Sequence, residues 1–287
     1  MENKKKRPIE ILVLSDIHLG TYGSHAKELL QYLRSISPKK VILNGDIIDI
    51  WQFKKRYFPK SHMKIIKHII GWVSKGIPVH YITGNHDEML RKFEGFKLGT
   101  FQIHNQYSIE LDGKSSWFFH GDVFDFTMQH ARWLTKVGAI GYDFLIVLNT
   151  IVNFFCRLLG QKRVSISKKI KDNVKGAVSF MNSFEQTVTE TAISKGFDAV
   201  FCGHIHQAQI SNFSSSTGSV VYLNSGDWVE NLTSLEYNDG SWHLYKHPKD
   251  LVKPESKVHP SNEVDTIDQS AKGLFQIMLQ DFKLQKK

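Results

Sequence analysis

The first half of the chain repeats one pattern, a short apolar run that ends abruptly in residues able to bind metal ions. Runs of this length, bounded by turn-forming residues, predict buried strands. Side chains at i and i+2 of an extended segment point the same way, so Asp16 and His18 are expected to face one point beyond the first strand. The predicted strands are 11–14 before Asp16 and His18, 41–43 before Asn44-Gly45-Asp46, and 78–82 before Thr83-Gly84-Asn85-His86-Asp87.

Helical periodicity separates these strands. Apolar residues recur at helical spacing over 24–36, where Ser24 is a candidate N-cap and Pro38 is expected to end the helix, and again over 62–74. Alternating strands and helices predict parallel βαβ units with right-handed crossovers. The carboxyl ends of the three strands then meet at one sheet edge, where open α/β sheets place their sites. A plain turn is the ordinary interpretation of any single motif of this kind, but the regular recurrence of ligand-type residues favours a site.

The second half brings two more such strand ends. Residues 101–111 predict a strand, followed by a hairpin turn over 112–114 and a partner strand over 116–119 that runs into His120-Gly121-Asp122. After a helix predicted over 178–194, a strand over 198–201 runs into Cys202-Gly203-His204-Ile205-His206. Later strands are predicted over 220–224 and 235–245, the second one bent at 238–240, and the polar turn 224–228 is a candidate lining of the site.

A helical insertion is predicted over 124–167, where the chain becomes aromatic and basic. Its most apolar part, 143–159, is shorter than the roughly 20 residues that span a bilayer, and Asn149, Asn153 and Arg157 interrupt it. Two interpretations stay open: a buried helix, or a lipid-facing helical pair that binds acyl chains. The lysines that follow over 161–175 form either a solvated face or a surface for phosphate and lipid headgroups.

These elements divide the chain into four regions. Residues 1–8 form a basic segment, 9–123 and 168–247 form one α/β domain, 124–167 form a helical cap, and 248–287 form a polar tail with a candidate helix over 273–284. The apolar stretch after the N-terminal basic residues is too short for a signal peptide. A chain of 287 residues is long enough for one large domain with a sizeable core.

The composition says more about the class of binding partner than about the fold. With 41% hydrophobic and 23% charged residues the chain is an ordinary globular protein. Cys156 and Cys202 give neither a disulfide framework nor a zinc-site spacing, and they predict a reducing, cytoplasmic compartment. A net charge of +9 favours an anionic partner: nucleic acid, a phosphorylated substrate or an acidic lipid surface. Because the basic residues form no stripe with stacking aromatics, specific nucleic-acid binding is not expected.

The polar residues at the strand ends form one set of oxygen and nitrogen donors. Such donors suit two divalent first-row cations, which lower the pKa of bound water and clamp a phosphoryl group. Asp46 is the candidate bridging carboxylate. His86 and Asp87 are the candidate catalytic residues, with Asp87 as a partner that orients the adjacent His86 imidazole. The set contains no cysteine, which disfavours a structural zinc site. Its members are Asp16, His18, Asp46, Asn85, His120, His204 and His206.

Five motifs occur along the chain in a fixed order: Asp-x-His, Gly-Asp, Gly-Asn-His-Asp, His-Gly-Asp and Gly-His-x-His. Together they resemble the calcineurin-like metallophosphoesterases over about 9–245, apart from the insertion. The resemblance implies an α/β fold, a four-layer α/β/β/α sandwich with a two-metal centre at one edge. It implies that Asp16, His18 and His206 hold one metal ion, that Asn85, His120 and His204 hold the other, that Asp46 bridges them, and that His86 is the general acid or phosphate-orienting histidine.

Within that family the chain is similar to the UDP-2,3-diacylglucosamine pyrophosphatases of lipid A synthesis. The similarity rests on Ser15-Asp16-Ile17-His18-Leu19 and on the apolar, basic insertion between the last two motifs. It implies two Mn²⁺ ions, a cap that takes the acyl chains of an acylated nucleotide sugar, and peripheral attachment to the cytoplasmic face of the inner membrane. UMP and the lipid monophosphate would be the products. The implied substrate contacts are Asn85, His86, Asp125, Ser167, Lys168, Lys171 and His204.

One departure keeps the substrate open. Well-known members of that subfamily carry an arginine at the position of His86. This chain has a histidine there, as general phosphoesterases do. The alternative is therefore a metallophosphoesterase that acts on another membrane-associated or nucleotide phosphoester. A non-catalytic scaffold would be marked by lost ligands, and every expected ligand is present. The sequence leaves the oligomeric state open.

Overall fold

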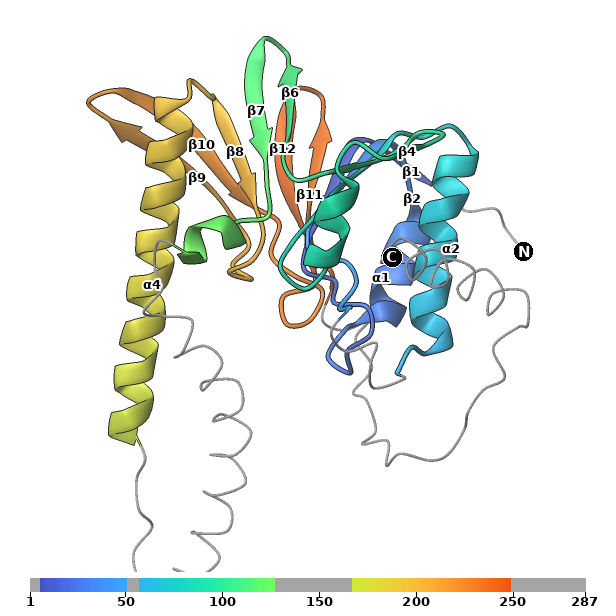
Figure 1. The fold of residues 1–287 in the computed structure, drawn as a ribbon, viewed down its shortest axis with the longest axis horizontal. Coiled ribbons are helices and arrows are strands. Elements are labelled where there is room, and N and C mark those ends of the chain that lie inside the picture. Colours follow the sequence, from blue (N-terminus) through green and yellow to red (C-terminus); the bar gives the residue numbers. More distant parts are fainter. Residues whose placement is uncertain (1–5, 51–56, 127–166, 249–287) are drawn as a thin grey trace, which may run out of the picture.

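Two β-sheets face each other at the centre of the molecule (Figure 1). A computed structural model describes residues 6–50, 57–126 and 167–248. Within these ranges the seven-stranded sheet has the order β12-β11-β1-β2-β3-β5-β4 and the five-stranded sheet the order β6-β7-β8-β10-β9. The strands of the first sheet are β1 (Arg7–Leu14), β2 (Ile36–Asn44), β3 (Val79–Ile82), β4 (Lys97–Leu98), β5 (Phe101–His104), β11 (Thr233–Asn238) and β12 (Ser241–Lys246). Those of the second are β6 (Tyr107–Leu111), β7 (Lys114–Phe118), β8 (Ala199–Cys202), β9 (Gln209–Ser215) and β10 (Gly218–Asn224).

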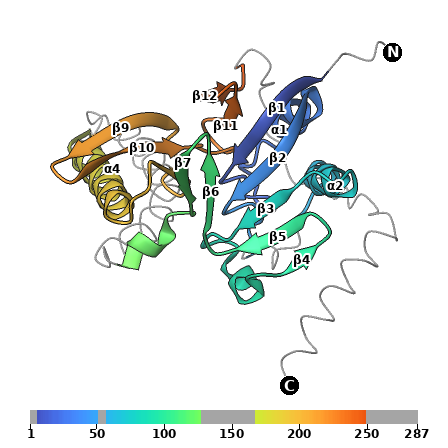
Figure 2. The same cartoon turned by 90° about the horizontal axis from the view of Figure 1, so that it is seen from above.

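Helices cover the outer face of each sheet and complete four layers (Figures 1 and 2). On the seven-stranded sheet, α1 (Ala26–Ser35) and α2 (Lys60–Ser74) bury apolar residues such as Leu29 and Ile65 against the strands. A second core, which includes Val13 and Phe201, fills the space between the sheets. A third packs α4 (Ser167–Ser194) on the five-stranded sheet through residues such as Phe184. The predicted α/β/β/α sandwich is therefore confirmed.

The strands that precede the predicted ligands run parallel. β1 pairs with β2 from Arg7↔Ile36 to Leu14↔Leu43, and β2 pairs with β3 over 41–44 and 79–82. In the other sheet β7 and β8 are also parallel. The carboxyl ends of β1, β2 and β3 therefore meet at one sheet edge, as predicted, and those of β7 and β8 meet in the same way in the second sheet.

Two segments that were each predicted as one strand contain two strands in the structure. The prediction over 101–111 is wrong because β5 belongs to the seven-stranded sheet and β6 to the five-stranded sheet. The chain crosses between the sheets at 105–106. The strand predicted over 235–245 is the antiparallel pair β11 and β12, with Asn238 opposite Ser241. β9, the outer strand of the five-stranded sheet, was not predicted.

The ends of α1 also differ from the prediction. The helix begins after His25, which makes no side-chain capping bond, so Ser24 is not its N-cap. It ends at Ser35, and Pro38 lies inside β2 opposite Ile9. Pro38 is tolerated because β2 pairs with β3 only from Val41 onward, so β2 still has an open side at Pro38.

Two short 3₁₀ helices complete the described elements: Glu88–Phe93 (η2) follows β3, and Asp122–Phe126 (η3) follows β7. α4 begins at Ser167, earlier than predicted, so the lysine-bearing stretch 168–175 is helical. Most of the predicted cap (127–166), the aromatic and basic segment 51–56 and the tail 249–287 lie outside the described residues. Among the helices described, none is long and apolar enough to cross a membrane.

Candidate metal centre

The predicted ligands lie on loops that follow five strands at one end of the sandwich. Asp16 and His18 follow β1, Asp46 follows β2, and Asn85 follows β3, all in the seven-stranded sheet. The five-stranded sheet adds His120 after β7 and the pair His204 and His206 after β8. Because these strands are parallel within each sheet, their ends bring side chains that are far apart in sequence to a common point.

Five of these residues have a left-handed backbone that is uncommon outside glycine. Their φ angles are 50° for Asp16, 51° for His18, 54° for Asp46, 67° for His204 and 55° for His206. Each such conformation costs about 1–3 kcal/mol and persists only where the surroundings impose it. Backbone bonds impose it on the first two loops: Asp16 N–H donates to Gly45 O (3.1 Å), and His18 N–H donates to Asp46 O (3.0 Å). Strain of this kind clusters at functional sites.

Two motif glycines let these loops approach each other closely. A Cβ atom on Gly84 would overlap the carboxylate and the backbone nitrogen of Asp46. A Cβ on Gly203 would overlap Asp16 and Ser15. Glycine is required at both positions because the neighbouring loop occupies the space that any side chain would need.

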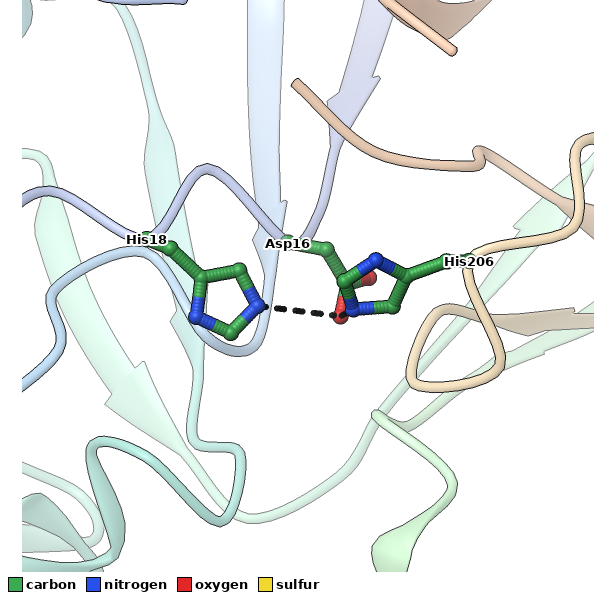
Figure 3. Close-up of side chains that lie close together, drawn as sticks. All are labelled: Asp16, His18 and His206. Atoms are coloured by element: carbon green, nitrogen blue, oxygen red, sulfur yellow. Dashed lines mark ion pairs between the residues drawn. The ribbon is translucent and has the colours of Figure 1, made fainter. Parts of the chain in front are cut away.

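Asp16, His18 and His206 form the first of two groups that share the site. Asp16 Oδ1 lies 3.3 Å from His206 Nε2 and 3.9 Å from His18 Nε2. Figure 3 shows the two imidazoles converging on this carboxylate from opposite sides. The three ligand atoms are close enough to one another to hold a single metal ion. This is the same trio that the family resemblance assigns to one metal.

Asp46 occupies the middle of the second group. Its Oδ2 lies 3.2 Å from His120 Nε2, 3.9 Å from His18 Nε2 and 4.0 Å from His86 Nε2. The Asp46 carboxylate thus faces imidazoles from both sheets, which is the position a bridging ligand needs. Two further sets of atoms could hold an ion here: His18, Asp46 and His86, and Asp16, Asp46 and His120.

The charges of the site call for cations. Burial opposes ionisation of Asp16, but His206 and His120 hold its pKa at about 2. Burial likewise opposes ionisation of Asp46, yet His120 and the other facing imidazoles hold its pKa far below the usual range. In return, Asp16 raises the pKa of His206 to about 9 against the effect of burial. The two buried carboxylates thus remain ionised and favour protonation of the neighbouring imidazoles. Bound divalent ions would neutralise the carboxylates and release those protons.

The donor atoms fit such ions. His18 Nε2 and Asn85 Oδ1 are buried without a hydrogen-bond partner among the described residues, although such partners are the rule for buried polar atoms. His120 donates from Nδ1 to the carbonyl oxygen of Asn44 (3.0 Å), which leaves Nε2 as the lone-pair donor. Burial lowers the pKa of His18, which keeps this imidazole neutral and able to bind metal.

His204 and Asn85 lie at the site but outside these groups. The His204 ring is 5.3 Å from that of His120, centroid to centroid, and its backbone N–H donates to Asp16 Oδ2 (3.1 Å). Asn85 offers its buried Oδ1. The structure therefore places His204 near His120, with which the resemblance groups it. A Cβ on Gly84, the residue before Asn85, would contact the His120 ring. The assignment of His204 and Asn85 as ligands stays a prediction.

The prediction that Asp87 orients His86 is wrong. The Asp87 carboxylate instead accepts hydrogen bonds from Ile47 N–H (3.0 Å), Tyr81 Oη–H (2.6 Å) and Gly84 N–H (2.5 Å). It therefore joins the loops after β2 and β3 to each other and to strand β3. Burial together with Asp46 raises its pKa to about 6. A role for Asp87 in the chemistry itself stays a prediction.

The partner of His86 is Asp49, which was not predicted. Asp49 Oδ2 lies 3.1 Å from His86 Nδ1. Burial lowers the pKa of His86, but Asp49 and Asp46 outweigh it and raise this pKa above its ordinary value. Asp49 stands three residues after Asp46 on the same loop. That spacing was visible in the sequence, but the loop path that brings the carboxylate to His86 was not.

The predicted polar turn does line the site. Asp227 Oδ2 lies 3.7 Å from His206 Nδ1. Asn231 Nδ2 donates both to the His206 carbonyl oxygen (2.7 Å) and to Asp227 Oδ2 (2.6 Å). These contacts fix both the ring and the backbone of His206. Asn231 is a second residue of the site that was not predicted.

The predicted substrate contacts of the cap are placed only by their backbone. Asp125 lies in η3, and Ser167, Lys168 and Lys171 lie in the first turns of α4. This end of α4 projects beyond the five-stranded sheet, below it in Figure 1. The side chains of these four residues lie outside the described part of the structure, and their contacts with substrate stay predictions.

Comparison with known proteins agrees with this architecture. The profile of the calcineurin-like phosphoesterases matches residues 9–208. The chain belongs to this family, and it is a metal-dependent hydrolase of phosphoester or phosphoanhydride bonds.

Similar proteins within the family have names that state a particular activity. A UDP-2,3-diacylglucosamine hydrolase of Aliivibrio fischeri is 23% identical over 82% of this chain and 98% of its own length. One of Stenotrophomonas maltophilia is 24% identical over 81% of this chain and 96% of its own length. A third, of Porphyromonas gingivalis, is 30% identical but over only 39% of this chain and 46% of its own length.

Proposed function

We propose that the chain hydrolyses UDP-2,3-diacylglucosamine to UMP and 2,3-diacylglucosamine 1-phosphate, a step of lipid A synthesis. The observation that carries the proposal is the meeting of two buried, ionised carboxylates with imidazoles from both sheets at one edge. A site of this kind binds divalent ions and the phosphoryl oxygens they attract. Relatives that carry this activity in their names span more than four-fifths of the chain, which supports the choice of substrate.

We assign two divalent ions to the site, manganese by the subfamily resemblance. When bound, they supply a water of lowered pKa and positive charge for the phosphate oxygens. Asp46 lies between the two groups of donors, and its proposed role is to bridge them. The proposed ligands are Asp16, His18 and His206 for one ion, and Asn85, His120 and His204 for the other.

His86 has a separate role in the proposal. Asp49 fixes the Nδ1 side of the imidazole, so Nε2 faces the site, 4.0 Å from Asp46 Oδ2. The His86 side chain is also partly exposed (29%), which leaves it accessible to substrate. The raised pKa favours the protonated imidazole, which donates a hydrogen bond to a phosphate oxygen or a proton to the leaving group.

The proposal also covers where the acyl chains bind and where in the cell the protein acts. The cap (124–167) receives the acyl chains, and Asp125, Ser167, Lys168 and Lys171 contact the substrate. The protein works in the cytoplasm, attached peripherally to the inner membrane. The net charge of +9 supports contact with acidic lipid headgroups.

A second candidate keeps the same chemistry with another phosphoester. His86, in place of the subfamily arginine, favours it, because an imidazole and a guanidinium bind phosphate differently. On this alternative the substrate is another membrane-associated or nucleotide phosphoester.

The manganese-loaded protein should release UMP from UDP-2,3-diacylglucosamine and cleave bis-p-nitrophenyl phosphate much more slowly. Generic cleavage without UMP release would overturn the lipid substrate and keep the metallophosphoesterase. A second series of substrates, without acyl chains, distinguishes the contribution of the cap from that of the metal centre. The diacylated substrate should be preferred, and equal rates on both would contradict the role of the cap.

A further inference from the structure

Next to the metal centre the chain presents an exposed aromatic surface that the proposed chemistry does not use. Tyr22 is 75% exposed, although it stands only four residues after His18. Its ring packs on that of Tyr57, with centroids 3.8 Å apart and an interplanar angle of 33°. One face of Tyr22 is thus supported by a second ring. An exposed tyrosine held in this way provides a flat, preorganised surface for another planar ring.

The loop that carries Tyr22 is fixed to the site by several bonds. Thr21 donates to the His18 carbonyl oxygen from its backbone N–H (3.1 Å) and from Oγ1 (2.9 Å). Leu19 O accepts from Asp49 N–H (2.8 Å), which ties this loop to the one that holds Asp49. Four residues span at most about 14 Å of extended chain, and the turn closed by Thr21 shortens that reach. Tyr22 therefore stays close to the metal centre.

A buried histidine explains how the two tyrosines are held together. His62, 2% exposed, accepts the Gly20 N–H at Nδ1 (2.9 Å). Its ring meets Tyr57 edge-on at 5.9 Å and Phe58 at 5.4 Å. Burial lowers the pKa of His62 to about 4, so the imidazole is neutral and keeps the lone pair that this bond requires. His62 thus joins the Tyr22 loop to the segment that carries Tyr57.

We propose that Tyr22, backed by Tyr57, stacks the nucleobase of a nucleotide substrate whose phosphate lies at the metal centre. The inference rests on the proposed function, because it assigns a binding surface to the nucleotide half of that substrate. The base is uncharged and planar, and it stacks on aromatic side chains without needing specific hydrogen bonds. This subsite lies on the loop after β1, whereas the proposal assigns the acyl chains to the cap.

Binding of UMP, the proposed product, tests this without catalysis. In protein loaded with zinc, which is diamagnetic, the uracil H5 and H6 resonances of UMP should shift upfield through the ring current of Tyr22. Tyr22→Leu should abolish that shift and raise the Kd for UMP about 5- to 100-fold, as expected for the loss of one stacked base. Tyr22→Phe should restore both. Phe96→Leu, which removes a partly exposed ring elsewhere, should change neither.

Inorganic phosphate is the second probe, because it occupies the metal centre and has no base. Its affinity should be equal in wild type and Tyr22→Leu. If both ligands weaken together, Tyr22 acts through the geometry of the loop and the stacking proposal is overturned. An unchanged UMP affinity in Tyr22→Leu also overturns it. Absence of UMP binding by wild type, with phosphate bound normally, would instead refute the nucleotide substrate itself.

Discussion

The floor and the rim of the metal centre are built differently. The floor, Asp16, Asp46 and His120, is almost fully buried, with 0–2% of each side chain exposed. The rim, His86 and His206, leaves 29% and 34% of its side chains exposed. The floor carboxylates hold their charge through facing imidazoles, whereas each rim imidazole is held from its far side by a carboxylate, Asp49 or Asp227.

The difference assigns separate tasks to the two parts. Buried ionised carboxylates are costly unless they are paired with cations, so the floor is suited to holding metal. The rim is accessible, and the neighbouring carboxylates set the protonation of its imidazoles. His206 completes the first group of metal donors, whereas His86 is placed to meet substrate. Substitutions in the floor should therefore remove metal and all activity together, and a substitution behind His86 should change the pH dependence while metal stays bound.

The largest effect is expected from Asp46→Asn in the floor. The amide keeps the size of the side chain but removes the charge that faces three imidazoles. We expect hydrolysis of bis-p-nitrophenyl phosphate to fall by at least about 10²–10³, with metal content reduced below that of wild type. Steady-state kinetics and elemental analysis of the purified protein measure both.

Asp239→Asn is the matched control for this prediction. Asp239 also has a left-handed backbone, with φ of 49°, but it lies in the turn between β11 and β12. The control should keep full activity and metal content. Wild-type activity and metal content in Asp46→Asn would show that the carboxylate does not bridge the two groups.

A smaller effect is expected where only the spacing of the floor changes. The added methyl group of Gly84→Ala overlaps Asp46, so the loops after β2 and β3 must move apart. We expect the free energy of unfolding to fall by about 1–3 kcal/mol. Because small displacements of catalytic groups are costly, activity should fall by up to about 10². Denaturant titration and kinetics under saturating metal measure the two changes.

Gly71→Ala provides the opposite case in the same chain. Gly71 lies inside α2, and a Cβ there meets nothing within 4 Å. This change should stabilise the protein by about 0.5–1 kcal/mol through helix propensity, with activity unchanged. If Gly84→Ala were as well tolerated as Gly71→Ala, the close approach of the two floor loops would not matter for the site.

The residues of the floor could be predicted from the sequence more fully than the contacts of the rim. Asp16, Asp46 and His120 were found because each follows a predicted strand, and parallel strands must end at a common edge. Only the apolar pattern and the position of the polar residue are needed to place these three residues. It holds even though the strand predicted over 101–111 was wrong, since β7 and β8 still end where the pattern placed them.

The rim depends on loop paths that the pattern does not encode. Adjacency in sequence suggested Asp87 as the partner of His86, but two loop N–H groups and the hydroxyl of Tyr81 in β3 surround the Asp87 carboxylate. Asp49 takes that place because the loop after β2 continues toward His86. Which of two nearby carboxylates faces an imidazole is decided by loop conformation, which periodicity and motif spacing leave undetermined.

The smallest effect is expected behind the rim, in Asp49→Asn. Asp49 and Asp46 raise the pKa of His86 against the effect of burial, so protonated His86 persists to higher pH than an ordinary histidine. If the protonated form is the active one, kcat/KM falls on the alkaline side as His86 loses its proton. Removing the Asp49 charge lowers this pKa, so the alkaline limb should move to lower pH by about one unit.

The pH profile distinguishes this role from a merely structural one. Loss of packing alone would lower kcat/KM at every pH and leave the limb in place, whereas loss of the charge moves the limb while metal content stays at the wild-type level. Glu28→Gln is the control, because it removes a carboxylate 3.5 Å from His25, outside the site, and should not move the limb. A limb that stays in place in Asp49→Asn would mean that Asp49 does not set the protonation of His86, and the contrast between a metal-holding floor and a proton-tuned rim would fail at this histidine.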